Sequence, residues 1–424
     1  PALLLIAASF QVHAQIKEIT FGKIPQEDLE MTEYLPDISA DAIILENHAK
    51  TVLSSKEDIL VITDCHVRIK IMNTDGLDYA NVEIPYGGDE KIYGLKAASY
   101  NLEDGSVVQT LVDRKSLYYE KTSNYRNTLR FSVPNVKPGT VIEYRYTHES
   151  TDYFSLYSFK FQEEIPVMRC TFRVEFPEYF DYKFVTGGDF HNIIYRYERR
   201  KISFGSSFMD GFEGSWTGSN IPAFREEPFS TGSEDYYSQI GFELSKINIP
   251  GYYFEDVSPT YPKLSELLMK RTDFGGYLSQ SSAVKKKAEE IKAQGGSETE
   301  ILRRIFTYIS EYMMWNGSSH FTSTESMSKI YKEARGNSAD INLMLLAMLR
   351  IAGLQADPVI FSTRENGMVN PVFAIIQRFN NVAVVASADG KQYIIDATDP
   401  LRPFNMLPLE CLNGEGWLVR NSGG

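Results

Sequence analysis

Apolar and polar residues alternate along most of the chain from Asp58 to about Leu244. A period of two residues is typical of strands that bury one face. Pairs such as Asp104-Gly105 and Pro138-Gly139 lie between the alternating stretches, where they predict turns. We therefore expect an antiparallel β-sandwich, or two smaller sheets, in this part of the chain. The clearest predicted strands are 61–71, 81–84, 91–100, 141–146 and 193–197.

After Pro259 the apolar pattern takes on a helical period. The residues Ser297-Glu298-Thr299-Glu300 form a capping-box sequence, which predicts the start of a helix at about residue 301. Helices followed by strands indicate an α+β domain. The predicted helices are 282–294, 301–314, 326–334 and 341–351, and the predicted strands are 371–376, 382–386 and 392–395.

Helix 341–351 is apolar on almost every side, so we expect it to be buried at the centre of this domain. Gly353 is its expected C-cap. The segment Gly336-Asn337-Ser338-Ala339-Asp340 precedes the helix. Asparagine and serine are both favoured N-caps, so Asn337 or Ser338 can satisfy a free N–H group of the first turn.

Three segments together resemble the core of the transglutaminase-like cysteine peptidase superfamily, which has a papain-like α+β fold. They are the Ser338 segment, Arg378-Phe379-Asn380-Asn381-Val382, and Tyr393-Ile394-Ile395-Asp396-Ala397-Thr398-Asp399. In that family the first segment holds a cysteine at the mouth of a helix, the second a histidine on a strand, and the third an aspartate on the next strand. Here the cysteine position is Ser338, the histidine position is Asn381, and Asp396 is retained.

These differences remove what the family's chemistry requires. A helix N-terminus lowers the pKa of a cysteine from about 8.5 toward roughly 3.5–7.5, and the histidine then moves the proton. A serine hydroxyl depends on a base, and the amide of Asn381 cannot act as one. The last histidine of the chain, His320, precedes Ser338, whereas in the family the histidine follows its nucleophile. The resemblance thus implies triad-equivalent positions at Ser338, Asn381 and Asp396 without catalysis.

A second interpretation stays open, in which the protein is a hydrolase or peptidase. Ser338 would then be the nucleophile, with Lys391 or Asp340 as its base, or the active site would lie elsewhere. Asp396 also has a structural interpretation, because the nearby Thr398 and Asp399 are typical of a turn or a cap.

The run from Phe131 to Tyr144 resembles a domain of unknown function found upstream of transglutaminase-like domains in Gram-negative envelope proteins. This resemblance covers most of residues 45–225 and brings no catalytic residues with it. We predict a β-sandwich domain at 15–255, a transglutaminase-like domain at 256–400, and the start of a truncated C-terminal β domain at 401–424.

Residues 2–8 are apolar, and Val12-His13-Ala14 fits the small-residue pattern that a signal peptidase reads. We therefore expect residues 1–14 to be the remnant of a signal peptide, with cleavage before Gln15. Together with the resemblance, this predicts a periplasmic, cell-surface or secreted protein of a Gram-negative bacterium.

The net charge of −13 argues against nucleic acid or an anionic membrane as a partner, because either would need a basic face. Six scattered histidines and three distant cysteines lack the spacing of metal ligands, so we expect no metal and no other cofactor. The expected partner is a peptide, a glycan or an envelope protein.

Overall fold

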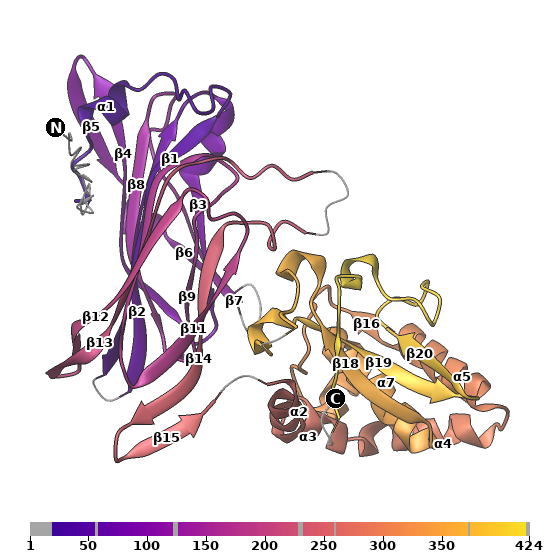
Figure 1. Ribbon diagram of the computed structural model, residues 1–424. Coiled ribbons are helices and arrows are strands. Elements are labelled where there is room, and N and C mark those ends of the chain that lie inside the picture. Colours follow the sequence, from indigo (N-terminus) through magenta and orange to yellow (C-terminus); the bar gives the residue numbers. More distant parts are fainter. Residues whose placement is uncertain are drawn as a thin grey trace, which may run out of the picture.

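The computed structural model describes residues 19–55, 58–121, 126–227, 232–257, 260–371 and 374–420. The predicted signal peptide lies outside these residues. A β-rich N-terminal domain is followed by a mixed α+β domain, and Figure 1 shows the two as separate bodies beside each other. The predicted multi-domain α+β fold is confirmed. In the described ranges, no helix is long and apolar enough to span a membrane.

The N-terminal domain is built on one long sheet of eight strands. Neighbouring strands run antiparallel, apart from β1 and β10, which run parallel. The expectation of a wholly antiparallel sandwich was therefore wrong for this pair. In sheet order the strands are β12 (Ile193–Phe204), β13 (Ser207–Ile221), β10 (Val167–Pro177), β1 (Ala42–Ser55), β2 (Ile59–Ile71), β8 (Val141–Ser150), β4 (Lys91–Glu103) and β5 (Ser106–Leu111).

Two smaller sheets share a hydrophobic core with one face of the large sheet. Alternate residues of β10, from Cys170 to Phe176, point into this core, where the rings of Phe172 and Phe159 stack 5.2 Å apart. Cys170 is a buried free thiol within this alternating pattern. The smaller sheets contain β11 (Phe180–Gly187), β14 (Gln239–Ile249), β15 (Tyr253–Asp256) and β9 (Ser155–Lys160), and β3 (Asn81–Gly87), β7 (Arg126–Ser132) and β6 (Tyr118–Lys121).

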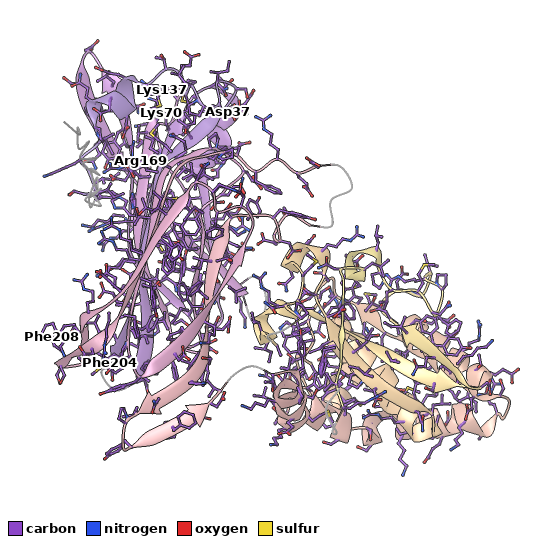
Figure 2. The ribbon with its side chains drawn as sticks, in the orientation of Figure 1. Asp37, Lys70, Lys137, Arg169, Phe204 and Phe208 are labelled. Carbon is purple, nitrogen blue, oxygen red and sulfur yellow. The ribbon has the colours of Figure 1, made fainter. Side chains whose placement is uncertain are left out.

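The segment from residue 19 to residue 41, with α1 (Gln26–Glu30), covers one end of the opposite, outer face of the large sheet. Figure 2 shows Lys70 and Arg169 at this end and Phe204 and Phe208 at the far end. Lys70 is buried beneath the segment, where its ammonium donates to the carbonyls of Leu29 (2.7 Å) and Gly139 (2.8 Å). Farther along, the outer face carries many polar and charged side chains, among them His66, Arg145 and Arg173, together with apolar ones such as Ile62.

The C-terminal domain packs helices around one central helix, α7, and against a sheet of four strands. The predicted capping box of α5 is present, because Ser297 accepts from the N–H of Glu300 and Glu300 accepts from that of Ser297. The helices are α2 (Tyr261–Lys270), α3 (Gly275–Ser279), α4 (Ser282–Ala293), α5 (Glu298–Tyr312), α6 (Met327–Glu333) and α7 (Ser338–Ala352). Two short strands, β16 (Met314–Trp315) and β17 (Arg335–Gly336), pair before α7.

The four-stranded sheet has the order β20 (Lys391–Ile395), β19 (Asn381–Ala388), β18 (Gln355–Phe361) and β21 (Trp417–Leu418). The predicted strand 371–376 was wrong. Its described residues form no strand and lead into a short 3₁₀ turn, Ile376–Arg378. Strand β19 pairs with β20 on one side and with β18 on the other, and β18 contains Pro358. Proline breaks most strand patterns, because it has no N–H to donate.

Residues 401–420 pack onto the C-terminal domain. Strand β21 pairs with β18, while Cys411 and Val419 are buried in hydrophobic clusters of the C-terminal domain. This stretch also supplies two side chains of the site described below.

Candidate functional site

Helix α7 begins at the site, and a capping box fixes its first turn. The Asn337 side chain accepts from the N–H of Asp340 at 2.8 Å, and the Asp340 carboxylate accepts from the N–H of Asn337 at 3.0 Å. The helix ends at Gly353, whose φ of 93° is left-handed. The apolar pattern predicted both the burial of this helix and its C-cap.

Ser338 is only 1% exposed, and its hydroxyl is fully engaged. The Oγ atom accepts from the N–H of His320 at 2.9 Å and donates to the carbonyl of His320 at 2.8 Å. The N–H of Ser338 donates to the carbonyl of Ser318. The serine thus ties the loop around residues 318–320 to the start of α7, while Asn337 serves as the cap.

Asn381 is the first residue of β19 and is also buried. Its Oδ1 accepts from the N–H of Val382 at 2.8 Å, and its Nδ2 donates to Sγ of Cys411 at 3.3 Å. Burial is the main cause that raises the pKa of the Cys411 thiol to about 12, and the negative charge of Asp396 adds to it. A raised thiol pKa disfavours the thiolate, which is the form of cysteine that acts as a nucleophile.

Asp396 follows β20 and is completely buried. One carboxylate oxygen accepts from Asn342 of α7 at 2.8 Å. The other accepts from the N–H of Thr398 at 3.0 Å, from its hydroxyl, and from the guanidinium of Arg402 at 2.8 Å. The carboxylate is therefore ion-paired and hydrogen-bonded on both oxygens, in the way that a buried charge requires.

Asn342 connects these parts of the site. Its amide nitrogen donates to the carbonyl of Val382 as well as to Asp396, and its oxygen accepts from the N–H of Ala397. It lies one helical turn after Ser338, so both side chains lie on the same face of α7. Among the described residues, the hydroxyl of Ser338 forms no hydrogen bond with Asn381 or Asp396.

The two alternative bases do not reach Ser338 through a hydrogen bond. The Asp340 carboxylate, whose pKa burial raises, is held by the N–H and hydroxyl of Thr324 and by the N–H of Asn337. Lys391 pairs with Ala388 at the turn between β19 and β20. That turn lies roughly 23 Å along the strand from Asn381.

The sequence analysis missed Asn342, Arg402, Cys411 and the backbone of His320. Asn342 had a signal, since it is an isolated amide within an otherwise apolar helix. The others come from segments that no motif connects to the site. The imidazole of His320 accepts from the N–H of Thr322 at 3.1 Å, and burial is the main cause that lowers its pKa.

Comparisons with known proteins define the class of each domain. Residues 285–393 match the model of the transglutaminase-like superfamily. Residues 60–224 match the model of DUF3857, a domain of unknown function with a solved structure. The C-terminal domain is therefore a transglutaminase-like domain, which is a peptidase-type family, and the chain joins it to an N-terminal DUF3857 domain. Both resemblances inferred from the sequence are confirmed.

One solved structure supports this assignment of the fold. A proposed protease from Parabacteroides distasonis has 16% identity and a TM-score of 0.60, with 85% of this chain and 70% of that chain covered. At this identity the similarity shows the fold alone. A proposed cysteine protease from Cytophaga hutchinsonii has 15% identity, a TM-score of 0.25 and coverage of 64% and 79%. No curated protein matches the chain.

Proposed function

We propose that this protein is a non-catalytic transglutaminase-like protein of the Gram-negative envelope, which binds a peptide, a glycan or a protein partner. The observation that carries this proposal is the hydroxyl of Ser338, which is hydrogen-bonded to both backbone groups of His320. A nucleophile needs a base that takes its proton. Among the residues that the structure describes, the acceptor of the Ser338 proton is the backbone carbonyl of His320, which is not protonated at neutral pH.

The other two triad-equivalent positions support the same proposal. The Asn381 amide has no basic atom, and it is held by Val382 and Cys411. Asp396 forms an ion pair with the guanidinium of Arg402. In the family's chemistry the aspartate would instead orient the imidazole of the histidine.

The test is a set of activity assays on the wild-type protein and on Ser338→Ala. We expect no labelling by a fluorophosphonate, no hydrolysis of a peptide library and no incorporation of an amine into glutamine-containing peptides. Turnover by the wild-type protein that disappears in Ser338→Ala would overturn the proposal and favour a serine hydrolase. Peptide and glycan arrays, together with pull-downs from envelope extracts, test the binding role separately.

A further inference from the structure

A cavity of about 560 Å³ opens on the outer face of the eight-stranded sheet in the N-terminal domain. Sites for small ligands commonly have volumes of about 300–1,000 Å³. The alternate residues of these strands, such as Val61, Ile142 and Phe172, point into the core on the other side. The cavity is therefore a feature of the polar face, next to the segment that begins at Ile19.

Strand register brings basic side chains from five strands together in this cavity. Cross-strand partners point to the same face of a sheet. Two neighbouring rows therefore line the cavity, from β10 through β1, β2 and β8 to β4. One row is Thr171, His48, His66, Arg145 and Lys96, and the other is Arg173, Lys50, Asp64, Thr147 and Tyr93.

Some of these groups are paired with carboxylates at the edges of the cavity. His66 lies 2.8 Å from Glu143, His48 lies 2.7 Å from Glu46, and Lys50 lies 2.6 Å from Glu175. Asp64, the acidic residue that lines the cavity, accepts from the hydroxyl of Thr147 at 2.6 Å.

Three cations have no such partner. Among the residues that the structure describes, no carboxylate oxygen lies within 4.0 Å of Lys96, Arg145 or Arg173. Lys96 and Arg145 are exposed, and Arg173 is half-buried. The guanidinium of Arg145 lies over the ring of Phe21, 5.8 Å from its centroid. Uncompensated charges of one sign in a concave site focus the field and attract ligands of the opposite sign, even on a chain with a net charge of −13.

The cations lie at two ends of the cavity. Lys96 and Arg145 are direct cross-strand partners on β4 and β8, whereas Arg173 lies on β10, three strands from β8. Neighbouring strands lie about 4.8 Å apart, and Arg173 is in the row next to that of Arg145, two residues further along the strands. The Cα atoms of Arg145 and Arg173 are therefore roughly 15 Å apart. The two groups of cations are thus separated along the cavity, which suits an elongated ligand better than a single small anion.

We propose that this cavity binds an elongated ligand that carries an oxyanion, a carboxylate or a phosphate, at each end. Arg145 and Lys96 hold one oxyanion and Arg173 holds the other, while the paired histidines form the floor between them. Arginine suits this role because its guanidinium donates two parallel hydrogen bonds to either kind of oxyanion. The inference concerns the N-terminal domain and stands whether or not Ser338 is catalytic.

The experiment is a calorimetric titration of the full chain with α,ω-dicarboxylates and α,ω-bisphosphates of increasing length, with acetate and inorganic phosphate as single-anion controls. We expect affinity to rise with length until both ends are reached, and to weaken with added salt. The two series distinguish carboxylate from phosphate ligands. Arg145→Gln or Arg173→Gln should each weaken the long ligands by about tenfold and abolish the dependence on length.

Arg196→Gln is the matched control, because it removes an exposed arginine of β12 that does not line the cavity. It should bind the long ligands as the wild-type protein does. The melting temperature of each variant shows whether it is folded. Equal affinity for one-anion and two-anion probes, or long-ligand binding that survives in the Arg145→Gln, Arg173→Gln double variant, would overturn the proposal.

Discussion

Replacement of Ser338 by alanine tests the structural role of this residue directly. The change removes two partly buried hydrogen bonds, of 2.9 and 2.8 Å, which join Oγ to the N–H and the carbonyl of His320. Each hydrogen bond contributes about 0.5–1.5 kcal/mol net. We expect Ser338→Ala to lower the free energy of unfolding of the C-terminal domain by about 1–3 kcal/mol.

Urea unfolding followed by tryptophan fluorescence measures this change. The chain has three tryptophans, and Trp216→Phe as the background variant leaves Trp315 and Trp417, both in the C-terminal domain. Trp315 is well placed, because its indole donates to the carbonyl of Ser318, which also accepts from the N–H of Ser338. Its signal therefore reports on the loop that Ser338 holds.

Two further variants fix the interpretation. Ser326→Ala removes an exposed N-cap with one long hydrogen bond, of 3.4 Å to the N–H of Lys329, and should cost no more than about 1 kcal/mol. Ser338→Cys keeps a weak donor and acceptor, so its stability should lie between those of Ser338→Ala and the wild-type protein. A loss below about 0.5 kcal/mol for Ser338→Ala would refute the reasoning, since catalytic groups are seldom optimised for stability.

Three other predictions follow from the described contacts. Arg402→Met should lower the free energy of unfolding of the C-terminal domain by about 3–5 kcal/mol, because it leaves the Asp396 charge buried without its ion-pair partner. Adding Asp396→Asn should recover part of this loss. An Arg402→Met variant with the same free energy of unfolding as the wild-type protein would contradict the argument. Burial raises the pKa of Glu163 to about 7, so the folded state binds a proton more tightly than the unfolded state, and stability should fall as pH rises from about 4.5 to about 7. The melting temperature of Glu163→Gln should therefore depend less steeply on pH in this range than that of the exposed control Glu164→Gln. Limited proteolysis should cut near residue 255 or at Gly295-Gly296 and leave a β-rich fragment, whereas a resistant block from 200 to 300 would argue against that boundary.

The features of the C-terminal domain that the sequence predicted correctly depend on short-range signals. The capping box of α5, the burial of α7 and its Gly353 cap are each determined by residues a few positions apart. Strand β18 escaped prediction because Pro358 interrupts its pattern, while 371–376 is apolar without forming a strand in its described part. Local propensity is a weak guide where pairing with other strands decides the outcome.

The contacts of the site depend on tertiary structure and could not be predicted in this way. Arg402 and Cys411 reach Asp396 and Asn381 from the stretch after β20, which no motif connects to the site. The basic cavity illustrates the same point. Its cations are spread from residue 50 to residue 173, and only the register of five strands assembles them. The net charge therefore gave no indication of a local basic face.

The retained carboxylate has a structural explanation that needs no catalysis. Asp396 and Asn342 together join α7, the start of β19 and the residues after β20, through the carbonyl of Val382 and the N–H of Ala397. A buried carboxylate is tolerated only with strong partners, and Arg402 supplies the charge that an imidazolium would otherwise provide. Removal of the Asp396 carboxylate would deprive Arg402 of its nearer ion-pair partner and Asn342 of one of its hydrogen bonds, so a structural role alone accounts for an aspartate at this position. The presence of Asp396 thus fits the proposed non-catalytic role and does not by itself indicate a reaction.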